Sequence, residues 1–170
     1  MINISSKLTE NLANKDIMKI SKLKNSFWHY GIKSNYNWFK KNMKKNDFHI
    51  LLYLKEELIG YLCLRKRTAT MNKQKIKYFY FDTLVVNSKY KGKSFGHLIM
   101  MSANNIIQKN NLHSFLLCND KHVNYYKKFN WVKLKKNYFK TLDHKSTLNG
   151  MVFNFEKVKF KTRMSYKINT

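Results

Sequence analysis

A strand, a turn, a helix and a second strand follow one another in the middle of the chain, and this order constrains the fold most. Residues 76–86 are rich in aromatic and β-branched side chains, which predicts a long strand. A glycine-containing loop over 87–96 leads to a helical pattern over 98–109 and then to a short apolar strand over 114–118. Strands joined through a helix pair in parallel with a right-handed crossover, so we expect an α/β sheet.

Helices and an antiparallel hairpin are predicted before this central pattern. Apolar residues recur at helical spacing over residues 16–30 and again over 35–45. Two short apolar runs, 48–53 and 58–64, lie on either side of an acidic turn. Runs of this length separated by a turn are typical of a β-hairpin, so we expect these two strands to be antiparallel neighbours.

Shorter elements are predicted after the central pattern. Residues 122–129 form a short helix, 131–134 begin a strand, and the alternating residues 151–158 close the sheet. We expect the tail over 159–170 to be frayed. The whole order predicts a mixed α/β (α+β) fold with a mostly antiparallel central sheet and helices on both faces.

The domain organisation is simple. The chain has 170 residues, which suits one domain with a full hydrophobic core. It contains no proline, no glycine-serine linker and no internal repeat that marks a boundary. We therefore predict a single domain over residues 1–170, with its core over 48–158.

The chain is strongly basic, with a formal net charge of +25. Such a charge attracts polyanions, including nucleic acid, anionic lipid, acidic proteins and phosphorylated small molecules. The lysines are spread along the chain and do not form one block, which favours a general compositional bias over a nucleic-acid footprint. A nucleic-acid partner is therefore not expected, although a basic nucleic-acid-binding module stays as one alternative.

Three further sequence features predict where the protein is located and whether it binds a metal ion. Cys63 and Cys118 each lie in an apolar run and form neither a CxxC pair nor a zinc set, so we expect reduced thiols and no metal. No run reaches the roughly 18 apolar residues of a membrane helix. Residues 1–5 lack the start of a secretion signal. We predict a cytoplasmic monomer or homodimer without a membrane span.

The loop after the long strand has the features of a phosphate cradle. Free N–H groups and the positive dipole end meet at the start of the following helix, and glycines let the backbone approach a ligand. Two lysines add positive charge. An ordinary strand-to-helix turn with solvated lysines is the alternative. The candidate residues are Lys91, Gly92, Lys93, Ser94, Phe95 and Gly96.

This run resembles the acetyl-CoA signature of the GNAT superfamily of N-acetyltransferases, which reads Gln/Arg-x-x-Gly-x-Gly/Ala. Lys91 stands where Gln or Arg is usual, and Ser94 stands where the first glycine is usual. Lysine still meets a phosphate as a point charge, although it lacks the bidentate fork of arginine. The resemblance implies a GNAT fold, acetyl-CoA as the cosubstrate and an amine as the acceptor.

A second segment resembles the same family. Residues 119–131 are similar to its Asn-x-x-Ala-x-x-hydrophobic-Tyr-Glu-Lys-hydrophobic-Gly-aromatic pattern, with Asn119 on the asparagine and Tyr126 on the tyrosine. Asn130 replaces the glycine at the helix end, where asparagine is the best-tolerated substitute. The resemblance implies that Asn119 and Tyr126 lie at the coenzyme and that Tyr126 protonates its sulfur. Tyr125 is the competing candidate for the acid.

The strand end supplies the other predicted site residues. By the same resemblance, the backbone groups of Leu84, Val85 and Val86 bind the pantetheine arm, and an N–H there faces the thioester oxygen. Asp82 is a carboxylate inside an apolar strand, which is costly without a partner or a function, so it is the candidate base. A simple ion pair with a lysine is the alternative. Other candidate bases, each more readily structural, are His29, His49, His113 and His122.

The acceptor is suggested by a finer resemblance. Residues 80–86 and 123–131 look like the aminoglycoside 2′-N-acetyltransferase branch and are also similar to acyltransferases of bacterial surface sugars. Both imply an amino sugar, and the positive charge favours an anionic or neutral one. Aromatic residues over 30–38 either stack on the sugar or pack in the core. An acyltransferase fed by acidic acyl carrier protein is a further alternative.

Overall fold

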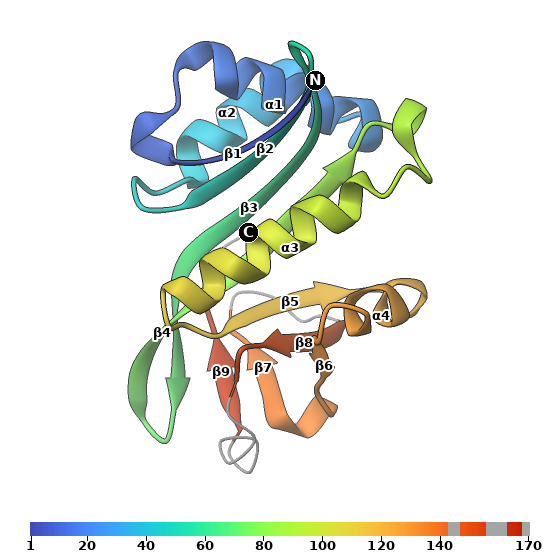
Figure 1. The fold of residues 1–170 in the computed structure, drawn as a ribbon. Helices are drawn as coiled ribbons and strands as arrows, with labels where there is room; N and C mark the ends of the chain where they lie inside the picture. The colour runs from blue at the N-terminus through green and yellow to red at the C-terminus, as the bar shows by residue number, and fades with distance from the viewer. Residues whose placement is uncertain (143–146, 156–162, 168–170) are drawn as a thin grey trace. The chain divides into compact units, whose positions relative to one another are not determined.

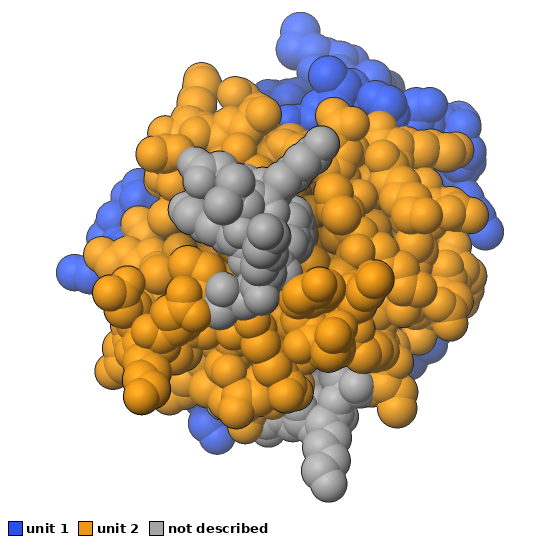
Figure 2. Space-filling view, turned by 90° about the horizontal axis from the view of Figure 1, so that it is seen from below, with its two compact units in different colours: residues 1–65, 82–103 blue, residues 66–81, 104–170 orange. Residues whose placement is uncertain are grey.

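The computed structural model describes three stretches of the chain, residues 1–142, 147–155 and 163–167. Their contacts divide into two units, coloured separately in Figure 2. Unit 1 contains residues 1–65 and 82–103, and unit 2 contains residues 66–81 and 104–170. The prediction of a single domain stays a prediction.

Unit 1 is built on antiparallel strands. The predicted hairpin is confirmed: β2 (Phe48–Leu54) pairs with β3 (Glu57–Met71) in antiparallel register. An unpredicted strand, β1 (Ile2–Leu8), pairs along β2 in antiparallel register. This strand is mostly exposed, so it lacks the apolar run from which the other strands were predicted.

Helices cover both faces of the β2–β3 hairpin within unit 1 (Figure 1). Helices α1 (Asn14–Trp28) and α2 (Ile32–Asn42) pack on the face that carries Tyr61, because the apolar residues of α1 recur at helical spacing. The preceding residue of β3, Gly60, faces the other side of the sheet. A Cβ atom there would lie 2.6 Å from Ile99 of α3 (Phe95–Lys109), so glycine permits this close packing.

Unit 2 contains the predicted parallel pair. Residues of β4 (Gln74–Val86) pair with β5 (Ser114–Cys118) in parallel, and β8 (Asn149–Phe153) pairs antiparallel with β5. The short strand β6 (Val132–Lys133) pairs with β8, and α4 (Asp120–Lys127) follows β5. Since most described strand pairs are antiparallel, the predicted mixed α/β fold is confirmed.

The tail differs from the prediction. Residues Met164–Tyr166 form β9, which pairs with β3 and with β7 (Phe139–Thr141). Tyr166 is fully buried and stacks on Phe115 at 3.9 Å between ring centroids. A three-residue strand is too short to show a periodic pattern in the sequence. It is recognised only from its pairing with β3 and β7, which lie far away in the sequence. Residues 156–158 of the predicted last strand, and 159–162 of the predicted tail, lie outside the described residues.

In the described part of the chain, three single turns of 3₁₀-helix complete the elements: η1 (Thr9–Asn11), η2 (Ser88–Tyr90) and η3 (Lys136–Tyr138). Among the described residues, no helix is long and apolar enough to cross a membrane.

Candidate active site

The bend after β4 is held by backbone and side-chain hydrogen bonds within unit 1. The Asn87 side chain accepts a hydrogen bond from the Lys89 N–H at 3.1 Å, and the Asn87 N–H donates to the Ile59 carbonyl at 2.8 Å. Glu57 accepts a hydrogen bond from the Tyr90 hydroxyl at 2.9 Å. These bonds fix the start of the predicted cradle against the β2–β3 hairpin.

Two residues of the cradle adopt left-handed backbone conformations. Gly92 has φ of 81° and Ser94 has φ of 58°. An added Cβ at Gly92 would meet no atom within 4 Å, so the space beside it is open. Ser94 occupies the position where the family signature has glycine, and its unusual φ explains why glycine is favoured there. The bend is therefore formed despite the serine.

Helix α3 begins three residues earlier than predicted, at Phe95. The Ser94 carbonyl accepts hydrogen bonds from the N–H groups of His97 and Leu98, at 3.0 and 3.3 Å. Phe95 is buried and anchors the first turn, whereas Lys91 and Lys93 are exposed. The first turn of α3 thus starts with N–H groups that have no partner within the helix, directly after two exposed lysines.

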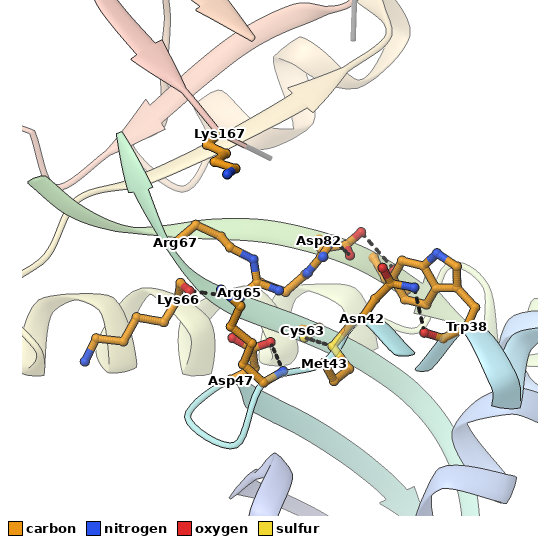
Figure 3. A network of polar contacts seen from close by, with 12 residues as sticks. Trp38, Asn42, Met43, Asp47, Cys63, Arg65, Lys66, Arg67, Asp82 and Lys167 are labelled. Atoms are coloured by element: carbon orange, nitrogen blue, oxygen red, sulfur yellow. Dashed lines mark hydrogen bonds and ion pairs between the residues drawn. The ribbon is translucent and has the colours of Figure 1, made fainter. Parts of the chain in front are cut away.

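Asp82 lies on β4 and forms an ion pair with Arg65, a residue that was not among the predicted site residues. The Arg65 Nη1 atom lies 3.2 Å from Asp82 Oδ2 (Figure 3). The Thr83 hydroxyl donates to Asp82 Oδ1 at 3.2 Å. The Arg65 side chain is 2% exposed and that of Asp82 is 20% exposed. The alternative prediction was an ion pair between Asp82 and a lysine; the partner in the structure is an arginine. The carboxylate of Asp82 stays partly exposed to solvent.

The backbone at Thr83 is unusual. Its φ is 53° inside β4, a conformation that a β-branched residue rarely adopts. Such outliers cost energy, persist only where surrounding contacts hold them, and cluster at functional sites. The distortion separates Asp82 from Leu84, Val85 and Val86, so it marks the strand end that was predicted to hold the pantetheine arm.

Two cations lie at the ring of Trp38 in α2. The Lys24 Nζ atom is 4.4 Å from the ring centroid, and the Arg65 Cζ atom is 5.4 Å from it. Burial lowers the pKa of Lys24; Asp82 opposes this shift and Arg65 adds to it. Trp38 therefore contacts the charged groups beside Asp82, and it is not part of the apolar cluster that α1 and α2 form on β3.

His49 has a structural environment. It is fully buried, and its ring nitrogens lie 2.7 Å from the Thr9 hydroxyl and 2.8 Å from the Tyr61 hydroxyl. Burial lowers the pKa of His49 to about 4. The ring is therefore neutral at neutral pH and already engaged on both sides, as expected for a structural histidine.

The second predicted segment forms the start, body and end of α4 in unit 2. Asn119 is the N-terminal cap residue, and its carbonyl accepts the His122 N–H at 3.0 Å. Asn130 has φ of 64°, which confirms the predicted left-handed position after the helix. The segment therefore has the local backbone geometry that its pattern predicts.

Tyr126 lies in an aromatic cluster of unit 2. Its ring contacts Phe81 edge-on at 5.8 Å and lies 6.1 Å from Trp131. Burial raises the pKa of its hydroxyl well above the ordinary tyrosine value, so the group keeps its proton at neutral pH. Within the described part of the chain the hydroxyl makes no hydrogen bond. It is therefore a protonated donor with no competing protein partner there.

No group of three or more histidine, cysteine or acidic residues that could hold a metal ion occurs among residues 1–142, 147–155 and 163–167.

Comparison with known proteins identifies the class. The model of the Acetyltransferase (GNAT) family matches residues 15–131, more than half of the chain, so this protein belongs to that family. It is an acyl-CoA-dependent N-acetyltransferase by class. No curated protein matches the sequence significantly.

Solved structures share the fold at low sequence identity. Escherichia coli ElaA is 14% identical with a TM-score of 0.66, over 89% of this chain and 99% of that chain. The E. coli GNAT family N-acetyltransferase YhbS, in complex with CoA, is 11% identical with a TM-score of 0.70, over 97% and 89%. The PaiA N-acetyltransferase of Thermoplasma acidophilum, in complex with coenzyme A, is 15% identical with a TM-score of 0.53, over 90% and 99%.

Proposed function

We propose that the protein transfers an acetyl group from acetyl-CoA to a primary amine, and that residues 91–96 bind the diphosphate of the coenzyme. The observation that carries the proposal is the bend itself. Gly92 and Ser94 are left-handed, the space beside Gly92 is open, and the first turn of α3 follows at once. Backbone N–H groups at a helix start bind phosphate without further charge.

The proposal places the rest of the coenzyme by family resemblance. The backbone of Leu84, Val85 and Val86 binds the pantetheine arm after the distortion at Thr83. Asn119 and Tyr126 belong to the coenzyme site through the second segment. YhbS and PaiA each have a structure in complex with the coenzyme, which supports a coenzyme site in this fold.

The chemistry requires a base, an acid and an oxyanion donor. The amine lone pair attacks the thioester carbonyl, and Asp82 accepts the amine proton directly or through a water molecule. A backbone N–H near the strand end stabilises the developing oxyanion. When the carbon–sulfur bond breaks, Tyr126 gives its proton to the coenzyme A thiolate. Its protonated, unengaged hydroxyl supports this role.

The proposed acceptor is an amino sugar or another small amine that is neutral or anionic. The net charge of +25 repels polycationic amines and attracts anionic ones. The sequence resemblance to amino-sugar acetyltransferases supports the same class.

Coenzyme A is expected to raise the melting temperature. At about 100 times its dissociation constant, a ligand that binds only the folded state stabilises it by about 2.7 kcal/mol. Lys91→Ala removes one phosphate-facing charge and is expected to reduce the shift. Lys109→Ala, at the opposite end of α3, is the matched control and should preserve it. Thermal unfolding with coenzyme A and acetyl-CoA measures this, and no shift with either ligand contradicts the proposal.

The remaining alternatives have separate outcomes. Turnover that prefers an acyl carrier protein thioester over acetyl-CoA, on one acceptor, favours the carrier as donor. Tight and strongly salt-dependent binding to nucleic acid, without any effect of coenzyme A, favours the nucleic-acid-binding module.

A further inference from the structure

Lys24 lies beside the ion pair of Arg65 and Asp82. Arg65 Nη1 is 3.2 Å from Asp82 Oδ2. The Lys24 ammonium and the Arg65 guanidinium lie at the same Trp38 ring, 4.4 and 5.4 Å from its centroid. Within the described residues, Lys24 makes no ion pair and no hydrogen bond. Its ammonium therefore has an aromatic ring and a second cation beside it, but no anionic partner there.

The position of Lys24 makes an unpaired ammonium costly. Lys24 lies on α1 with its side chain half-buried at the Trp38 ring. Desolvation and the nearby guanidinium of Arg65 both disfavour its ammonium form. A cation–π contact compensates only part of such a cost. An anion bound at Lys24 would offset the rest.

We propose that the acceptor amine carries a nearby anionic group, a carboxylate or a phosphate, which binds the Lys24 ammonium over Trp38 while the amine faces Asp82. The inference rests on the proposed role of Asp82 as base. The Arg65 side chain is only 2% exposed, so its role in this proposal is to hold Asp82 in place. The contact with the anionic group is then made by Lys24. The same charge repels polycationic acceptors, which separates this substrate class from aminoglycosides.

Matched pairs of amines test the proposal in the presence of coenzyme A. Glucosamine is compared with glucosamine 6-phosphate, and ethanolamine with β-alanine, by calorimetric binding and by thiol release from acetyl-CoA. At least one anionic member is expected to bind about tenfold or more tightly than its neutral partner. The phosphate and carboxylate pairs show which group is preferred.

Variants of Lys24 give the decisive comparison. Lys24→Gln is expected to reduce the affinity ratio within the preferred pair by about tenfold, whereas Lys24→Arg retains it. Lys22→Gln changes an exposed lysine on the same helix and should leave the ratio unchanged. Melting temperatures confirm that each variant is folded.

Two results overturn the inference: neither anionic amine binds more tightly than its partner, or the ratio is the same in Lys24→Gln and the wild-type protein. Failure of the proposed function is distinct, because then coenzyme A itself produces no thermal shift.

Discussion

Tyr126→Phe is expected to lower kcat by about 10²- to 10⁴-fold, the usual contribution of a positioned acid, with a much smaller effect on coenzyme affinity. The substitution removes only the hydroxyl. Because that hydroxyl makes no hydrogen bond within the described residues, its loss leaves no protein group there unsatisfied. The ring contacts with Phe81 and Trp131 are kept. Steady-state thiol release and thermal unfolding measure the two effects.

Tyr125→Phe is the matched control. Tyr125 is the adjacent tyrosine, is also half-buried, and contacts Phe129 edge-on at 5.3 Å. Near wild-type turnover is expected for this variant. The acid assignment is wrong if Tyr126→Phe retains wild-type kcat, and it moves to Tyr125 if the two variants behave in the opposite way.

Asp82→Asn is expected to lower kcat by about 10²- to 10⁴-fold as well, because an amide cannot accept the amine proton. Asp82→Glu keeps a carboxylate and should recover part of the rate. The variant also breaks the Arg65–Asp82 ion pair, and the loss of one member of a buried pair is destabilising. Kinetics must therefore be compared with melting temperatures, and the kcat loss must exceed what the folded fraction explains.

Asp16→Asn separates the loss of an ion pair from the loss of a base. Asp16 pairs with Lys7 at 2.9 Å in the same unit and also accepts the Ala13 N–H at the start of α1. We expect lower stability but wild-type kcat per folded molecule. An Asp82→Asn enzyme that behaves like Asp16→Asn would show that Asp82 is only a structural partner of Arg65.

Local patterns predicted much of the fold because they are strong within short windows. The aromatic and β-branched run of β4, the hairpin β2–β3 and the strand β5 were all found from periodicity. The strands β1 and β9 were missed, since their pairing with β2 and β3 depends on contacts distant in sequence. Long-range strand pairing stabilises β1 and β9, and a short window of sequence contains no sign of that pairing.

The candidate site was predictable to the same extent. Asp82 was found because a carboxylate in an apolar strand is conspicuous, and the bend at 91–96 because glycines and lysines precede a helix. Arg65 was missed, although an arginine after the apolar run of β3 is an equally unusual residue. Lys24 carried no signal among so many lysines, and only its position over Trp38 distinguishes it.

Amide hydrogen exchange with and without coenzyme A tests the central claim most directly. We expect the coenzyme to slow exchange at the first turn of α3, above all at Phe95 and Gly96, and to leave β1 in the same unit unchanged. Coenzyme binding that protects other segments and leaves residues 91–98 unaffected would contradict the account.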